Sequence, residues 1–183
     1  MEVTLEITNY CPNHCDYCST NASPKNERML LLFKEVEYFL SDIEETIDRI
    51  NISGGEPLSH PSFYAILQLC YTFTDNVWVY TNAITQILYN TDIVKEIKVE
   101  ANACLVPGRP VYIPANADKV HLLQLVPQGR AKDMKPVKFH VSGNIIGEHK
   151  CAECDHVLLQ ADGKVMEAPC KKDYSCKKIK KEN

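Results

Sequence analysis

Three cysteines are crowded into one short loop near the start of the chain. Cys11, Cys15 and Cys18 stand in a C-x3-C-x2-C pattern directly after a predicted strand. Three thiolates at this spacing can bind three irons of a [4Fe–4S] cluster and leave the fourth iron open to another ligand. A zinc site is the alternative, because His14 lies inside the loop and could complete a set of four ligands.

Two further polar segments follow the next two predicted strands. The first contains Ser53, Gly54, Gly55 and Glu56, and the second is Thr81-Asn82-Ala83. A Gly-Gly pair by itself usually marks only a turn. Here the missing Cβ atoms would also let the backbone approach a bound ligand closely.

A second group of cysteines lies near the other end of the chain. Cys151 and Cys154 form a C-x2-C pair, and Cys170 and Cys176 follow. An Asp-Gly turn between Cys154 and Cys170 predicts a hairpin that brings the two pairs together. The four thiols could bind a second iron–sulfur cluster or, almost equally well by spacing, a structural zinc ion.

The remaining candidate ligands have simpler interpretations. His149 and His156 flank the second group and are interpreted as incidental polar residues. Cys70 falls on the predicted buried face of a helix, where a thiol packs as a small apolar group. Cys104 lies in a stretch predicted to be mostly irregular, residues 102–118, and no ligand role is assigned to it.

Composition limits the class of protein. The chain has 183 residues, nine cysteines and a net charge of −4, which gives no sign of nucleic-acid binding. The basic charge gathers towards the lysine-rich C-terminus, interpreted as a solvated tail. With no apolar run long enough for a signal peptide or a membrane span, we expect a cytoplasmic protein. Its thiols then serve as ligands rather than as disulfide partners.

The patterning predicts alternating strands and helices. Predicted strands cover residues 3–8, 49–53, 77–80, 97–101 and 120–126, with a short one near Phe139. Predicted helices cover residues 31–50, 59–71 (capped by Ser59) and 85–95. The apolar face of the first helix comprises Leu32, Val36, Phe39, Leu40, Ile43 and Ile47, and that of the second comprises Phe63, Ile66, Leu67 and Cys70. A hairpin with arms 156–160 and 164–167 follows.

Alternating strands and helices predict an α/β fold built on a parallel sheet with right-handed crossovers. We expect a partial, open β/α barrel over residues 1–136 with about five or six mainly parallel strands. A small cysteine-bearing hairpin appendage with a lysine-rich tail should occupy residues 137–183. In such folds the carboxyl ends of the strands carry the chemistry, and all three N-terminal motifs follow such ends.

The cysteine loop and the Gly-Gly-Glu segment together resemble the signature of the radical S-adenosylmethionine (SAM) superfamily. The resemblance implies that Cys11, Cys15 and Cys18 hold a [4Fe–4S] cluster. It implies that Gly54, Gly55 and Glu56 bind the methionyl end of SAM, with Ser53 and Asn82 as weaker contacts. The implied reaction is reductive cleavage of SAM to a 5′-deoxyadenosyl radical, which abstracts hydrogen from a substrate.

The C-terminal cysteines and the stretch Val126-Pro127-Gln128-Gly129-Arg130-Ala131 resemble the SPASM/twitch group, most closely the GTP 3′,8-cyclase family of molybdenum-cofactor biosynthesis. That resemblance implies a second [4Fe–4S] cluster held by Cys151, Cys154 and Cys170. We predict Cys176 as its fourth ligand; the alternative is that one iron stays open and binds the substrate directly. Two departures argue against GTP as the substrate. Residues 102–118 are too few for the further β/α units, and the double-glycine tail is absent.

Three classes of function remain from the sequence. The first is a radical SAM enzyme that modifies a nucleotide or a peptide. The second is an activase of a glycyl-radical enzyme, acting on a partner protein. The third is a non-catalytic iron–sulfur or zinc interaction protein. The first two also require a small electron donor such as ferredoxin or flavodoxin, and none of the three requires a membrane.

Overall fold

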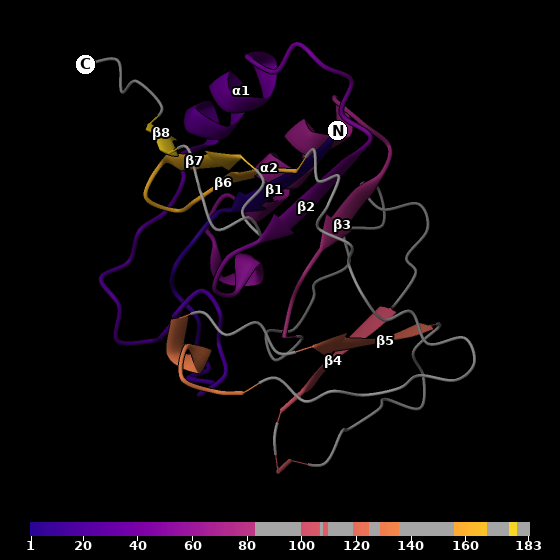
Figure 1. The fold of residues 1–183 in the computed structure, drawn as a ribbon. Helices are drawn as coiled ribbons and strands as arrows, with labels where there is room; N and C mark the ends of the chain where they lie inside the picture. The colour runs from indigo at the N-terminus through magenta and orange to yellow at the C-terminus, as the bar shows by residue number, and fades with distance from the viewer. Residues whose placement is uncertain are drawn as a thin grey trace. The chain divides into compact units, whose positions relative to one another are not determined.

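The computed structural model describes seven segments of the chain, which form two compact units (Figure 1). The first unit includes residues 1–14, 22–82, 156–167 and 176–178. The second includes residues 15–21, 100–106, 108–109, 119–124 and 129–135. The boundary between them therefore passes through the cysteine loop, immediately before Cys15.

A six-stranded sheet forms the first unit. Its strands are β1 (Glu2–Glu6), β2 (Arg49–Ser53), β3 (Val77–Val79), β6 (Val157–Leu159), β7 (Lys164–Glu167) and β8 (Cys176–Lys178). They lie in the order β3-β2-β1-β6-β7-β8. The first four are mutually parallel, and β7 and β8 run antiparallel to their neighbours. The predicted α/β fold with a mainly parallel sheet is confirmed.

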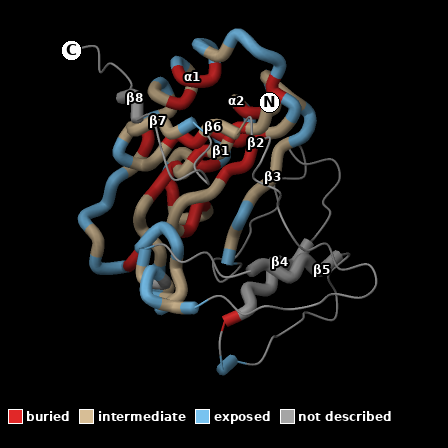
Figure 2. Tube along the Cα trace, viewed as in Figure 1, coloured by how far each residue is buried: buried red, intermediate tan, exposed pale blue. Residues whose placement is uncertain are grey.

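The core lies on one face of this sheet. Alternation along the strand sends Val3, Leu5 and Ile7 to that face, where each is fully buried. Helices α1 (Phe33–Ser41) and α2 (Phe63–Tyr71) bury their apolar faces in the same core. Figure 2 shows the buried residues concentrated along the central strands of this sheet and along the helices. The predicted inward face of α2 is confirmed at all four positions.

Both helices are shorter than predicted. α1 begins at Phe33 because the preceding residue, Leu32, has an extended backbone and is the N-cap. Leu32 is 64% exposed, and its N–H donates a hydrogen bond to the Glu35 carboxylate. It ends at Ser41, where serine and then aspartate favour a cap over helix interior. Ser59 is not the cap of α2, since it closes the short 3₁₀ turn η1 (Pro57–Ser59) instead.

The predicted C-terminal hairpin is present and belongs to the main sheet. β6 and β7 pair around a turn in which Gly163 adopts a φ of +78°. β6 also pairs in parallel with β1, so that Val3 lies opposite Val157. The sequence did not specify this position beside β1. The proposed domain boundary after residue 136 lies outside the described residues and stays a prediction.

The second unit contains the parallel pair β4 (Glu100–Leu105) and β5 (Lys119–Gln124), followed by the 3₁₀ turn η2 (Gly129–Ala131). β4 extends to Leu105, so residues 102–105 are strand where irregular chain was predicted. The predicted helix 85–95 and the strand near Phe139 lie outside the described residues. A small apolar cluster packs Val106 against Tyr17 and Met134.

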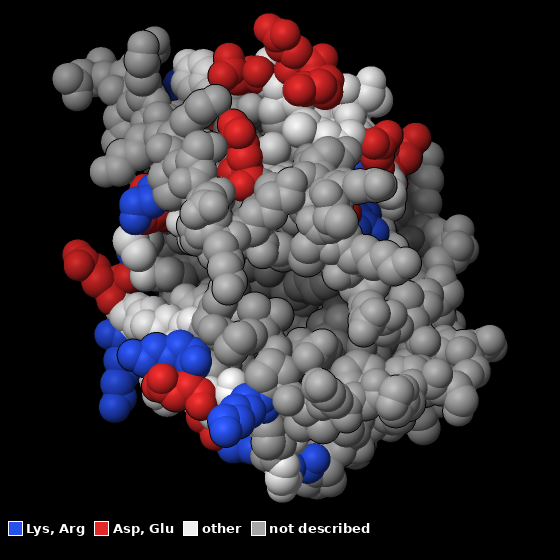
Figure 3. Space-filling view, in the orientation of Figure 1, with Lys and Arg blue, Asp and Glu red and all other residues white. Residues whose placement is uncertain are grey.

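Acidic side chains gather over α1 and the turn after it (Figure 3). They belong to Glu35, Glu37, Asp42, Glu44 and Glu45. In the part of the chain that the structure describes, no helix has both the length and the apolar character needed to cross a membrane.

Candidate functional site: the cysteine loop and the carboxyl edge of the sheet

The predicted motifs of the first unit meet at one edge of its sheet. The cysteine loop follows β1, the Gly54-Gly55-Glu56 segment follows β2, and Thr81-Asn82 follows β3. Because these strands are parallel, their carboxyl ends share an edge. Backbone hydrogen bonds join the first two segments, from Gly55 N to Thr8 O (2.6 Å) and from Glu56 N to Tyr10 O (2.8 Å).

The two glycines are needed because the chain before Cys11 passes directly against them. A Cβ on Gly54 would lie 2.4 Å from Thr8 O, and the φ of +123° at Gly54 also disfavours any other residue. A Cβ on Gly55 would lie 2.1 Å from Tyr10 O. The sequence predicted that the missing Cβ atoms let a ligand approach the backbone closely. In the structure the protein's own backbone lies at these two Cβ positions.

Glu56 ties this segment to the end of β3. Its side chain is fully buried. One carboxylate oxygen accepts hydrogen bonds from Leu58 N (3.0 Å) and Thr81 Oγ1 (2.8 Å), and the other accepts from Asn82 N (2.9 Å). Glu56 thus fixes where Asn82 lies. A direct contact of Glu56 with SAM stays a prediction.

Asn82 connects β3 to the first cysteine. Its Nδ2 lies 3.6 Å from Cys11 Sγ and donates a hydrogen bond to it. Hydrogen bonds to cysteine sulfur are among the means by which a protein tunes the potential of an iron–sulfur cluster. Asn82 was predicted only as a SAM contact, and its hydrogen bond to the Cys11 thiol was not foreseen.

Cys15 and Cys18 belong to the second unit, where Arg130 holds them. Arg130 Nε donates to Cys15 O (2.7 Å), and Arg130 N donates to Cys18 O (3.0 Å). Cys18 N also donates to Cys15 O (3.3 Å). Sequence reasoning noted the Gly129-Arg130 stretch only as a resemblance and gave it no role. No local pattern could have linked residues more than 100 positions apart.

The donor set of the loop fits a [4Fe–4S] cluster. Cys11, Cys15 and Cys18 are half-buried, and none of these three is in a disulfide. No three Cys, His, Asp or Glu side chains within the described segments converge on one metal ion. That is compatible with a cubane, whose three cysteines bind three different irons. His14, the candidate fourth zinc ligand, instead has its Nδ1 3.1 Å from Ser23 Oγ.

Of the C-terminal cysteines, only Cys176 falls among the described residues. Its backbone starts β8 and lies opposite Met166 of β7. The sequence placed this cysteine on a lysine-rich tail, whereas the structure includes it in the sheet. Cys151, Cys154 and Cys170 lie outside the described residues, so a second metal site stays a prediction.

Three of the four residues given simpler interpretations lie among the described residues, whereas His149 lies outside them. Cys70 is fully buried in α2, and burial raises the pKa of its thiol to about 12, as befits an inert core residue. His156 Nε2 lies 2.6 Å from Thr4 Oγ1, a structural contact that agrees with its interpretation as an incidental polar residue. Cys104 lies in β4.

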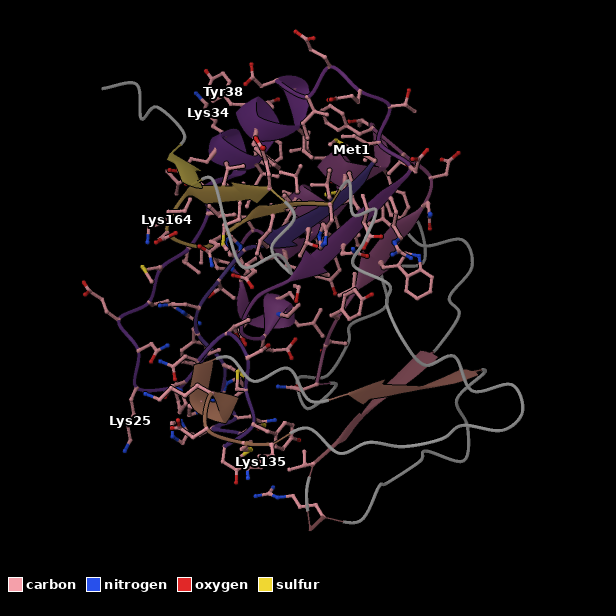
Figure 4. The ribbon with its side chains drawn as sticks, viewed as in Figure 1. Met1, Lys25, Lys34, Tyr38, Lys135 and Lys164 are labelled. Carbon is pink, nitrogen blue, oxygen red and sulfur yellow. The ribbon has the colours of Figure 1, made fainter. Side chains whose placement is uncertain are left out.

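A carboxylic acid that sequence reasoning did not single out ends β1. Burial, and second the charge of Asp162, raise the pKa of Glu6 from 4.5 to about 7. Asp162 lies in the β6–β7 turn, beside Lys164, which is labelled in Figure 4. Burial alone would raise the pKa of Asp162, but hydrogen bonds from Lys164 and its charge outweigh this and lower it. At pH 7 Glu6 is thus protonated in about half of the molecules, while Asp162 is ionised.

The raised pKa of Glu6 predicts a pH-dependent stability. Between pH 4.5 and about 7 the folded protein holds a proton that the unfolded chain has lost. The free energy of unfolding therefore falls as the pH rises through this window, by at most about 3.4 kcal/mol at 1.36 kcal/mol per pKa unit. Urea unfolding at pH 5 to 8 measures the change. The Glu6→Gln variant should lose this pH-dependent contribution to the free energy of unfolding. In Asp162→Asn the pKa of Glu6 should lie closer to its ordinary value, so stability should fall over a narrower pH range. A Glu6→Gln variant with the wild-type pH profile would contradict the assignment.

Residues 5–107, more than half of the chain, match the family model of the radical SAM superfamily. The chain belongs to the radical SAM superfamily. Membership makes the chain part of an enzyme family that uses SAM together with a [4Fe–4S] cluster. It also agrees with the cysteine loop and the Gly-Gly-Glu segment, both of which fall inside the match.

Two curated relatives resemble the chain over less than half its length. A PqqA peptide cyclase of Bradyrhizobium diazoefficiens is 31% identical over 86 residues, covering 46% of this chain and 22% of that protein. An S-adenosylmethionine-dependent nucleotide dehydratase of Selenomonas ruminantium is 30% identical over 83 residues, covering 44% of this chain and 29% of that protein. The aligned region spans less than a third of either relative.

A solved structure supports the fold. Streptococcus suis SuiB, crystallised with S-adenosylmethionine, superposes with a TM-score of 0.65 over 95% of this chain and 62% of that chain. The sequence identity is 11%, so the likeness concerns the fold alone. It agrees with a partial radical SAM barrel.

Proposed function

We propose that this chain reductively cleaves SAM and uses the resulting 5′-deoxyadenosyl radical to abstract a hydrogen atom from a substrate. The observation that carries the proposal is the meeting of the cysteine loop with the Gly-Gly-Glu segment and Asn82 at one sheet edge, in a chain of this superfamily. When bound, the cluster supplies the electron for SAM cleavage.

In this proposal the chain's own residues bind and orient. Cys11, Cys15 and Cys18 provide the thiolates. Ser53, Gly54, Gly55 and Glu56 form the segment against which the methionyl end of SAM is proposed to lie. Glu56 positions Asn82 through the Asn82 N–H, and the Asn82 side chain reaches Cys11 Sγ. A small electron donor such as ferredoxin or flavodoxin, and a cytoplasmic location, are part of the same proposal.

For the substrate we propose a peptide or a nucleotide. The support is that one relative is named a peptide cyclase and the other a nucleotide dehydratase, at nearly equal identity. An activase of a glycyl-radical enzyme remains a second candidate, since it needs the same SAM chemistry but acts on a folded partner. A non-catalytic interaction protein is the third, and it would not cleave SAM.

The test is anaerobic incubation of reconstituted protein with SAM and dithionite. We expect methionine and 5′-deoxyadenosine to form in equal amounts, because each cleavage releases one of each. Deuterated peptide and nucleotide pools added in parallel should transfer deuterium into 5′-deoxyadenosine only in the arm that contains the substrate class. A protein that binds the cluster yet forms no 5′-deoxyadenosine would leave only the non-catalytic alternative.

A second prediction concerns the C-terminal cysteines. If Cys151, Cys154, Cys170 and Cys176 bind a second [4Fe–4S] cluster, the reconstituted wild type should contain about eight irons per chain. Replacing Cys151, Cys154 and Cys170 by alanine should reduce this to about four. Iron, sulfide and zinc analysis measures it. One zinc and only about four irons in the wild type would instead establish a structural zinc site.

A further inference from the structure

We infer that Arg130 is a positioning residue for the cysteine loop: it holds the main chain of Cys15 and Cys18 and makes the bound cluster easier to reduce. The inference rests on the proposed function, because it assumes that Cys15 and Cys18 bind the cluster. It goes beyond that proposal by assigning a role to a residue more than 100 positions away from the loop.

Arg130 meets the loop at three points. Its Nε donates to Cys15 O at 2.7 Å and its backbone N–H donates to Cys18 O at 3.0 Å. Its NH1 donates to Asn21 Oδ1 at 3.2 Å. One residue thus engages the carbonyl groups of two expected iron ligands and the end of the same segment. Fixing both carbonyls limits how the two cysteine side chains can turn.

The neighbouring residues are shaped for this contact. Gly129 has a φ of +55°, and a Cβ there would lie 2.5 Å from Ser19 O and 2.6 Å from Cys18 O. η2 therefore lies directly against the loop backbone, which only glycine allows. Asn21 has a φ of +57°, a left-handed conformation that asparagine tolerates better than most residues. From that conformation its side chain accepts the Arg130 hydrogen bond.

Electrostatics gives the contact a consequence for redox chemistry. A cluster bound by thiolates carries net negative charge, and its reduction by one electron adds one further negative charge. The positively charged Arg130 guanidinium is half-buried and donates to the backbone of one expected ligand residue, Cys15. A fixed cation near the cluster favours the reduced form and so raises the reduction potential.

A second arginine in the same unit provides a matched control. Arg109 pairs with the Asp16 carboxylate and lies 5.7 Å from the centre of the Tyr17 ring. Both members of that ion pair have 52% of their side-chain surface exposed, so solvent screens it. Arg109 also contacts only side chains of the loop in the described interactions. Removal of the Arg109 side chain deletes the same charge but leaves the hydrogen bond from Arg130 Nε to Cys15 O in place.

The experiment compares Arg130→Gln, Arg130→Lys and Arg109→Gln with the wild type after anaerobic reconstitution. The readouts are iron and sulfide per chain, the electron paramagnetic resonance signal of the reduced cluster, and its midpoint potential. The proposal predicts that Arg130→Gln loses at least half its iron, or retains a cluster whose reduction equilibrium is about tenfold less favourable, equivalent to about 59 mV for one electron. Arg130→Lys should keep the potential but lose iron faster to a chelator. Arg109→Gln should match the wild type.

If Arg130→Gln fails to fold, as judged by circular dichroism, Asn21→Gly decides instead. Glycine tolerates the φ of +57° and removes the side chain whose oxygen accepts from Arg130, so faster iron loss to a chelator is expected. If these variants keep the wild-type iron content, reduction potential and rate of iron loss to a chelator, the inference about Arg130 is wrong and the proposed function is unaffected. A wild-type protein that binds no cubane would instead overturn the proposed function.

Discussion

Simultaneous replacement of Cys11, Cys15 and Cys18 by alanine should abolish 5′-deoxyadenosine formation and remove about four irons per chain. The expectation follows from the assignment of the three cluster ligands to this loop, which lies inside the part of the chain that matches the radical SAM superfamily. The measurement is product formation from SAM and dithionite, together with iron and sulfide content. The effect should be complete, since SAM has no electron source without the cluster.

Cys70→Ala is the matched control for this experiment. It also removes a thiol, but one that is fully buried in α2, with its pKa raised to about 12. Loss of one buried sulfur should cost about 1 kcal/mol of stability and leave iron content and SAM cleavage unchanged. Product formation at the wild-type level in the triple variant would sink the assignment of the cluster to this loop.

Gly55→Ala should have the next largest effect, with loss of both cluster binding and SAM binding. A Cβ at this position would lie 2.1 Å from Tyr10 O, and Tyr10 immediately precedes Cys11. The backbone must shift to relieve the overlap, which displaces the first ligand. From the sequence alone, only SAM affinity would be expected to suffer, because the contact with Tyr10 is not visible there. The measurements are cluster absorbance after reconstitution and SAM affinity by equilibrium dialysis.

Gly108→Ala separates this steric effect from the general cost of losing a glycine. Gly108 has a φ of +74°, so alanine is strained there by roughly 1–2 kcal/mol, but nothing lies within 4 Å of the added Cβ. The control should therefore lose some stability and keep both ligands. If Gly55→Ala retained the cluster and SAM affinity as well as Gly108→Ala does, the close packing at Tyr10 would not matter for the site.

What could be predicted from the sequence is what local patterns encode. The alternation of Val3, Leu5 and Ile7 predicts β1, and the polar segments after each strand predict the shared edge. Leu32 shows the limit of periodicity, since it continues the apolar stripe of α1 yet lies outside the helix as an exposed cap. Spacing alone does not say where a helix begins.

The site was less predictable where it depends on contacts between residues that lie far apart in the sequence. Nothing near Cys15 or Cys18 indicates that Arg130 binds their carbonyls, because hydrogen bonds to backbone oxygen require no particular residue type on the acceptor side. Glu6 was missed for a related reason. Its carboxyl group is unusual only because the chain is folded around it and Asp162 stands near it.

The pairing of β6 with β1 has a consequence for the order in which the protein can be made. After Val3, the ribosome must add 154 residues to reach Val157, and only then can β6 pair with β1 on that side. At 5–20 residues per second, a ribosome takes roughly 8–30 s to reach that point. Until then β1 is an exposed edge strand of an apolar sheet. Such edges can pair with strands of other chains and lead to aggregation. A nascent chain stalled or cut before residue 157 should therefore be a client of chaperones, and slow growth at low temperature should favour soluble expression.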